Sequence, residues 1–534
     1  MKLNHLKQTP MALSLTMVLM QMLMLMGLVA CSQIPPLPQT DWTVPVQWKE
    51  SSQASKEPHE DSPGSSGSSS SSGSSVASSA SGASITSNSK ISLAQPSPEA
   101  EQWWTALKDE TLNRLEGELL GGNVNVLSLS AQVRVAQATL RQSQASLWPT
   151  VNVTASSSRA ANQLSVPKGT SYSMNASLSW ELDVWGRIDA LTQVASANAQ
   201  ASEGDLAQAK RSARATLVQT YLNFRLAQAQ SALLREAEGA YEKSLALTQA
   251  KYRAGVVSQS DVASAQTQFK TTQAQRHDLD LQSAQLEHAL AVLMGRAPSE
   301  LRLAPLPWEP LLNVDTARES MGSFTQRDAQ GFNDHALKWP PQPPALPDVV
   351  ALSVLQKRPD IRAAQLRVQA ANAQVGVAKA AFFPPLTLSS SAGYRNTDLP
   401  ALIGASNQAW SLGPSLVLPL IDGGLRQANK EIAQAQLDAA VLNYRQVVLT
   451  AFQEVEDNLV ASLELLAEEE AYQSAAQSAL QNLKITLSQY QNGTLAYLNV
   501  VSAQTAALNA QKALLNARAQ RWLAWNVLQK NFFM

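Results

Sequence analysis

The sequence predicts a mainly α-helical chain that carries a smaller β part and is built as an internal duplication. The first observation is a repeat: seven of the sixteen residues from Tyr252 to Thr267 are identical in Tyr490 to Thr505, at an offset of 490 − 252 = 238. The second is that long stretches with helical spacing flank each copy. The third is that two pairs of shorter stretches alternate apolar and polar residues with a period of two, as half-buried strands do.

The first 30 residues have the pattern of a lipoprotein signal peptide. Lys2 and Lys7 supply the positive charge, and an apolar run spans 11–26. The small residues of 28–30 precede Cys31, which would become the lipidated N-terminus after cleavage. An ordinary signal peptide with an incidental Cys31 is the alternative interpretation. Because Cys31 is the only cysteine of the chain, no intrachain disulfide can form.

Two segments without a predicted fold follow the signal peptide. Ser32 is not the aspartate that retains familiar bacterial lipoproteins at the inner membrane, so we expect the outer membrane as the destination. Residues 31–50 contain prolines and tryptophans, and we expect them to have an extended backbone and to form a lipid-anchored N-terminus. Residues 51–98 are rich in Ser, Gly and Ala and cannot bury a core, which predicts a flexible linker.

The first structural repeat is expected over 99–302. An amphipathic helix starts at Trp103 and stops at Gly121-Gly122, and a second helix runs to about Ser146 before Pro149. Residues 151–155 and 172–184 then alternate with a period of two, which predicts a β-hairpin with one apolar and one polar face. Strands of about ten residues have the length needed to cross a bilayer when tilted.

A very long helical hairpin completes this repeat. The 66 residues from Arg187 to Tyr252 contain no proline, and a helix of that length would extend about 100 Å. Gly255 ends this helix and the next begins two or three residues later, which is typical of an αα-hairpin.

The second structural repeat, over 348–534, has the same plan. Its helix ends before Pro384, its strands alternate over 386–392 and 410–420, and its long helix ends near Gly493. Residues 303–347 are rich in proline and are expected to form a linker between the repeats, crossing the outside of the helical body.

Four strands from one chain cannot close a membrane barrel, because an open edge in lipid leaves backbone groups unpaired at several kcal/mol each. Three copies would supply twelve strands, enough to enclose a water-filled lumen. The sequence therefore predicts a homotrimer: a 12-strand β-barrel in the outer membrane, continued by a long periplasmic α-helical barrel. The turns at Gly255 and Gly493 would lie at the far end of this tunnel.

The sequence resembles the TolC-like outer-membrane factor family, in particular the lipidated channels of tripartite efflux systems. The resemblance covers about Glu99 to the C-terminus. It is carried, in order, by Trp180-Glu181-Leu182-Asp183-Val184-Trp185-Gly186-Arg187, Arg358-Pro359-Asp360-Ile361, Phe383-Pro384, Pro419-Leu420-Ile421-Asp422-Gly423-Gly424 and the two Tyr-x-x-Gly turns.

The resemblance implies a trimer that works with a periplasmic membrane-fusion adaptor and an inner-membrane transporter. Its function would be the outer-membrane exit duct of an efflux pump, passing drugs or other toxic compounds to the exterior. The adaptor would contact the tips of the helical hairpins, which here are Ala254, Gly255, Val256 and Val257, and Asn492, Gly493, Thr494 and Leu495.

The sequence departs from the family at the expected periplasmic aperture. Characterised relatives close it with an Arg-Tyr pair before the second turn and an Asp about a turn and a half beyond. Here those positions hold Gln489, Tyr490 and Ser502. We therefore expect closure to depend on neutral hydrogen bonds and on the packing of Tyr490.

Other classes of function are disfavoured by the composition. A net charge of −1 does not suit a nucleic-acid partner, and the five histidines show no metal-binding or acid–base spacing, so we expect neither an enzyme nor a metal or cofactor site. Two alternatives stay open. The channel of a type I protein secretion system would have the same features, and a lipid-anchored coiled-coil scaffold without a pore would explain the helices but not the strands.

Overall fold

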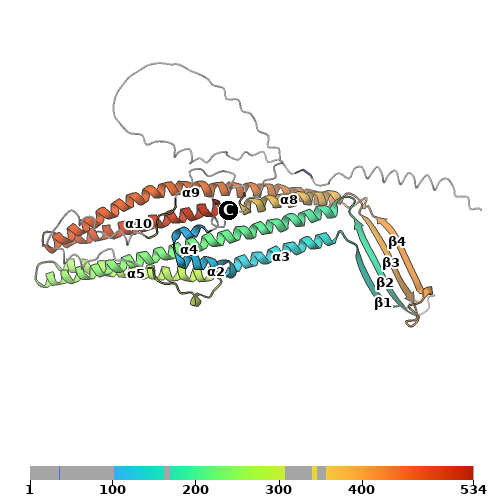
Figure 1. Cartoon of the computed structure of the whole chain (residues 1–534), viewed down its shortest axis with the longest axis horizontal. Helices are drawn as coiled ribbons and strands as arrows, with labels where there is room; N and C mark the ends of the chain where they lie inside the picture. Colours follow the sequence, from blue (N-terminus) through green and yellow to red (C-terminus); the bar gives the residue numbers. More distant parts are fainter. Residues whose placement is uncertain (1–34, 37–101, 161–168, 307–338, 345–356, 533–534) are drawn as a thin grey trace, which may run out of the picture.

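The computed structural model describes residues 35–36, 102–160, 169–306, 339–344 and 357–532. The expected signal peptide, Cys31 and the Ser/Gly-rich linker lie outside these residues, as does most of the Pro-rich linker. The described chain is elongated, with a sheet at one end and two helical turns at the other, while its last helix ends near the middle of its length (Figure 1).

The sheet joins strands from both halves of the chain. Its four strands are antiparallel and lie in the order β1-β2-β3-β4, so the two hairpins pair through β2 and β3. The strands are β1 (Thr150–Ala160), β2 (Gly169–Leu182), β3 (Leu386–Asn396) and β4 (Gln408–Leu416). The alternation in 410–420 predicted a longer β4, and this was wrong. The strand ends at Leu416 because its partner β3 begins at Leu386, directly opposite.

Two long helical hairpins run from the sheet to the far end. They consist of α4 (Arg187–Arg253) with α5 (Gln259–Leu293), and α9 (Leu425–Gln491) with α10 (Tyr497–Phe532). Helices α4 and α9 have 67 residues each and are therefore about 100 Å long. None of the helices in the described ranges combines the length and the apolarity needed to cross a membrane.

Shorter helices fill the half nearest the sheet. Helix α3 (Val124–Ala145) packs along α4, and α8 (Pro359–Ala380) packs along both α4 and α9 (Figure 1). The side-chain amide of Asn123 donates to the carbonyl of Leu293, so the start of α3 meets the end of α5. A Cβ on Gly295 would lie 2.1 Å from the carbonyl oxygen of Gly122, so this close approach requires glycine.

The main hydrophobic core lies near the middle of the molecule's length, where the first helices of the described chain pack against α10, the last one. It contains the 3-10 helix η2 (Trp103–Leu107) and α2 (Glu110–Gly122), which pack against α4 and α10. The indole of Trp103 donates to Asn526 over 2.9 Å. The single helix expected from Trp103 onward is wrong. Lys108 has a left-handed backbone, and the carboxylate of Asp109 caps a new helix by accepting from the backbone N–H groups of Thr111 and Leu112.

The first strand-to-helix turn is fixed by two acidic residues. Glu181 accepts two hydrogen bonds from Arg187, at 2.8 and 2.7 Å, and Asp183 accepts from the backbone N–H groups of Ile188 and Asp189. The corresponding turn in the second half uses Asp422, which accepts from the guanidinium of Arg426 over 2.6 Å. These contacts set the direction in which each long helix leaves the sheet.

Candidate functional site

The two helical turns at the far end share one backbone geometry. Gly255 and Gly493 both have positive φ values, 72° and 78°, which glycine adopts without strain. In the first turn the N–H of Val256 donates to the carbonyl of Lys251, and in the second Thr494 donates to Gln489. Each long helix therefore ends in the same glycine-terminated cap.

The predicted docking residues lie at these two tips, and most of them are exposed. Ala254, Gly255 and Val256 are exposed in the first tip, while Val257 is half-buried. In the second tip the exposed residues are Asn492, Gly493 and Thr494, and the half-buried one is Leu495. A small apolar cluster of Ala265, Tyr490, Tyr497 and Val500 holds the two hairpins together just behind the tips.

Tyr490 is the centre of this cluster. Its side chain is 3% exposed, and its ring lies 5.4 Å from that of Tyr497. The Thr248 hydroxyl donates its proton to the backbone carbonyl of Ser244 in its own helix. The Tyr490 hydroxyl is therefore the donor in its hydrogen bond with Thr248, which spans 3.1 Å. The ammonium of Lys251 donates to the carbonyl of Tyr490 over 2.7 Å and lies 3.9 Å from the centre of its ring. Both hairpins are thereby joined at one side chain.

The other two aperture candidates take no part in this contact. Gln489 is exposed, and its backbone carbonyl accepts from Thr494. Ser502 is also exposed and donates to Leu498 of its own helix. Lys251 thus brings a charged group to Tyr490 beside the neutral hydrogen bond with Thr248, while closure of the aperture through Tyr490 stays a prediction.

Lys251 was not predicted from the sequence, although the duplication contains a signal for it. Lys251 and Gln489 occupy equivalent positions, since 489 − 251 = 238. The charge that is missing before the second turn is therefore present before the first. The equivalent tyrosines also differ, because Tyr252 is 45% exposed whereas Tyr490 is buried.

The helices that follow the two tips start differently. Helix α5 begins with a capping box, in which the Ser258 hydroxyl accepts from the N–H of Asp261 and the Asp261 carboxylate accepts from the N–H of Ser258. The position equivalent to Ser258 is Ala496, which has no side-chain acceptor. The first tip is therefore stabilised locally in a way that the second is not.

The lateral edges of the chain are open. In the described chain β1 and β4 each pair with one strand only. The helices beside them, α3 and α9, expose large apolar side chains to solvent. These are Val124, Leu127 and Val135 on α3, and Leu425, Ile432, Leu442 and Leu449 on α9. Unpaired strand edges and apolar helix faces together indicate surfaces that other chains cover.

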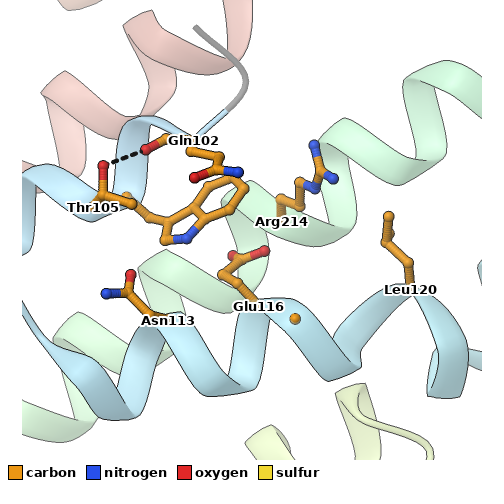
Figure 2. Close-up of a pocket in the computed structure, with 8 residues that line it drawn as sticks. Gln102, Thr105, Asn113, Glu116, Leu120 and Arg214 are labelled. Carbon is orange, nitrogen blue, oxygen red and sulfur yellow. Dashed lines mark hydrogen bonds between the residues drawn. The ribbon is translucent and has the colours of Figure 1, made fainter. Parts of the chain in front are cut away.

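A cavity of about 540 Å³ lies beside the mid-length core. Its lining includes Trp104, Glu116 and Arg214, and Figure 2 shows the side chain of Glu116 directed into it from α2. Glu116 is 4% exposed, and neither of its carboxylate oxygens has a hydrogen-bond partner within the described residues. Burial raises the pKa of Glu116 from its ordinary 4.5 to about 8, against the opposing effect of the Arg214 charge.

This cavity has no arrangement typical of catalysis. Glu116 is its only carboxylate, and Arg214 lies with its guanidinium carbon 5.2 Å from the ring centre of Trp104. Over the described part of the chain there is also no group of three or more His, Cys, Asp or Glu side chains placed to hold a metal ion. The tips and the open edges are therefore the features from which a function can be argued.

Comparison with known protein families and sequences gives consistent matches over both halves. The family model described as outer membrane efflux protein matches residues 115–296 and 351–531. The chain is 30% identical to outer membrane protein OprJ of Pseudomonas aeruginosa, over 79% of this chain and 84% of the relative. It is also 30% identical to the toluene efflux pump outer membrane protein TtgI of Pseudomonas putida, over 80% and 85%. The cation efflux system protein CusC of Escherichia coli K12 is 29% identical, over 78% and 85%.

Solved structures match the fold as well. The outer-membrane channel OprN superposes with a TM-score of 0.71 at 26% identity, covering 81% of this chain and 92% of the other. A structure of CusC gives a TM-score of 0.69 at 26% identity, covering 82% and 94%. The resemblance noted in the sequence is therefore confirmed in both sequence and fold, including the combination of a β-barrel with an α-helical barrel.

Proposed function

The chain belongs to the outer membrane efflux protein family, and we propose that it is the exit duct of a tripartite pump for drugs or other toxic small molecules. Members of this family are channels of the outer membrane that extend into the periplasm and have no enzymatic activity. The chain is thus an outer-membrane efflux channel, and the pore-free scaffold is excluded. The cargo, the partners and the assembly are the content of the proposal.

The open edges of the sheet are the observation that carries the proposed assembly. Strands β1 and β4 have free edges, and in lipid each unpaired backbone group would cost several kcal/mol. Copies of the chain can satisfy both edges at once, because β4 of one copy can pair with β1 of the next. Three copies with four strands each give a closed barrel of twelve strands with a water-filled lumen. This supports a homotrimer.

The exposed tips support docking of a periplasmic adaptor. Val256 and Thr494 are exposed in the turns that follow α4 and α9. These turns lie at the end of the molecule opposite the sheet, about one helix length away from it (Figure 1). A tip of small residues with one exposed apolar side chain suits a helical partner that packs closely against it. The adaptor would in turn connect the duct to an inner-membrane transporter, which would select the cargo.

The remaining segments complete the proposed topology. Lipidation of Cys31 would anchor residues 31–50 in the outer membrane, and residues 51–98 would link this anchor to the first repeat. We place the two structural repeats at 99–302 and 348–534, with the Pro-rich linker 303–347 between them. The relatives include a protein of a toluene efflux pump and one of a cation efflux system. Because similar ducts serve such different cargoes, we propose that the associated transporter determines the cargo class.

Site-specific photo-crosslinking in the native host tests this function. A photoreactive residue replaces Val256 in one variant and Thr494 in another, because a side chain at either position avoids the positive φ of the tip glycines. The matched control carries it at Leu399, which is exposed in the connection between β3 and β4 of the sheet. We expect both tip variants, but not the control, to capture a periplasmic adaptor.

The identity of the captured protein decides between the alternatives. An adaptor that belongs with a drug or solvent transporter would support the proposed cargo. An adaptor of a type I secretion system would replace that cargo by a polypeptide. Capture of copies of this chain alone from both tips would refute docking at the tips.

A further inference from the structure

We propose that Arg395 forms a ring of positive charge at the outer mouth of the channel, where it attracts anionic solutes and repels cationic ones. Strands β1 and β3 follow α3 and α8, so their last residues, Ala160 and Asn396, lie at the end of the sheet away from the helices. This end is the outer mouth. The inference rests on the proposed closure of several copies into a barrel with a water-filled lumen, and it adds the charge that a departing solute meets last.

The two faces of the sheet differ in polarity. On one face serine hydroxyls meet across the strands: those of Ser156 and Ser173 lie 2.8 Å apart, and those of Ser391 and Ser411 lie 2.9 Å apart. This serine face consists of every second residue over 150–158, 171–181, 387–395 and 411–415. The residues between them form the apolar face, which includes Trp410 with 76% exposure. In a barrel lipid covers the apolar face, so the serine face lines the lumen.

The four described strands contain three charged side chains, and two of these belong to the serine face. Arg159 follows Ser158 of the serine face by one residue and therefore lies on the apolar face. Glu181 lies at the helix end of β2, and two hydrogen bonds from Arg187 neutralise it. Arg395 is thus the one uncompensated charge that the described strands place on the serine face.

The position of Arg395 suits a charge at the mouth of the lumen. Its side chain is exposed, and its Nε donates to the hydroxyl of Ser171 on the serine face over 3.3 Å. Among the described residues it forms no ion pair, and the nearest carboxylate along the chain, Asp398, lies beyond the strand in the connection to β4. Arg395 is nine residues from the start of β3 at Leu386 (395 − 386 = 9), which is about 30 Å along the strand.

The proposed assembly strengthens the effect of this charge. Strand β3 is an inner strand of the sheet, paired on both sides, so Arg395 still faces the lumen when neighbouring copies pair with β1 and β4. Symmetry brings one guanidinium from each copy to the same level. The wall of protein and lipid has a low dielectric constant and focuses the field into the water-filled lumen. Because arginine stays protonated, the resulting preference for anions depends on salt but not on pH in the physiological range.

Charged thiol reagents measure the local potential. Ser173→Cys places a reporter thiol on the serine face, directly opposite Arg395. Two methanethiosulfonates of similar size, one with a sulfonate and one with a trimethylammonium group, modify it in the purified full-length protein in lipid nanodiscs. Adding Arg395→Gln should lower the ratio of the anionic to the cationic modification rate by about fivefold or more at about 10 mM salt, and by about twofold or less at about 1 M salt. A change in the reactivity of the thiol itself affects both rates and cancels in the ratio.

The matched control is Arg159→Gln, which removes the same charge near the same end of the sheet but from the apolar face. It should change the ratio by less than about twofold. The chain without the reporter measures any labelling of Cys31, its only natural cysteine. A reporter that both reagents modify, at a ratio that Arg395→Gln leaves unchanged, would refute the charge ring while the barrel stands. A reporter that neither reagent modifies would refute the ring together with the water-filled lumen. The tip-capture experiment tests the efflux partners independently of both outcomes.

Discussion

Replacing Glu116 by glutamine should remove a pH-dependent penalty that the folded chain carries. Burial in the mid-length cavity raises the pKa of Glu116 from 4.5 to about 8, although Arg214 opposes the shift. The folded chain therefore favours the protonated carboxyl. Its contribution to stability is full below about pH 4.5 and is lost as the pH rises through about 8, where the unfolded chain releases the proton more easily.

The pKa values set the size of this effect. Each pKa unit corresponds to about 1.4 kcal/mol, so the change from 4.5 to about 8 corresponds to at most about 5 kcal/mol of unfolding free energy. Water that enters the cavity solvates the carboxylate and lowers this cost. We therefore expect Glu116→Gln to be more stable than the wild type by about 2–5 kcal/mol at about pH 9, and equal within about 1 kcal/mol at about pH 4.

Thermal unfolding of the purified protein in detergent, followed at several pH values, measures this difference. The matched control is Glu468→Gln, which removes an exposed carboxylate from α9 and should leave the pH dependence unchanged. The reasoning would be refuted by wild-type and Glu116→Gln curves that stay parallel from acid to alkaline pH. Such a result would mean that Glu116 is charged and well solvated in the folded protein.

Two further predictions concern the tips. Lys251→Met keeps the length of the side chain but removes its hydrogen bond and its cation–π contact with Tyr490, weakening the link between the hairpins by about 1–2 kcal/mol. Single-channel recordings should then show roughly tenfold more frequent opening, and unchanged recordings would contradict this role. Ser258→Ala should lower the free energy of local opening at the start of α5 by about 1 kcal/mol and so speed amide hydrogen exchange there. Ala496→Ser should raise the same quantity at the start of α10 by about 1 kcal/mol and slow the exchange. Equal exchange in all three proteins would rule out a difference in capping.

The fold could be predicted because its sequence patterns are local and occur in both halves of the chain. A period of two, helical spacing and single glycines are visible within a few residues. Each of them recurs in the other half, at an offset of 235 for Pro149 and Pro384 and of 238 for the long helical hairpins. The break between η2 and α2 was missed, because the apolar spacing continues across it. Asp109 was the available signal, since an aspartate before Glu110 and Thr111 is a good helix cap.

The contacts that carry chemistry were harder to predict, because they join segments far apart in the chain. Glu116 lies among Leu112, Leu115 and Leu119 on the buried side of α2, and a lone carboxylate in such a stripe was a usable signal. Lys251 and Tyr490 are 239 residues apart, and no local pattern indicates that they touch. Only the comparison of equivalent positions in the two repeats points to a cation before the first turn.

The two halves share a backbone plan, but their tips differ in what stabilises them. The first tip has the capping box at Ser258, and its Tyr252 is exposed and makes no contribution to the cluster behind the tips. The second tip lacks that cap, and its Tyr490 is fixed by Thr248 and Lys251 of the first hairpin. The second tip has a local side-chain contact as well, since the Thr494 hydroxyl donates to the carbonyl of Gln489, but it has no capping box. We therefore expect loss of the Lys251 contact to loosen α9 and α10 at their tip more than α4 and α5.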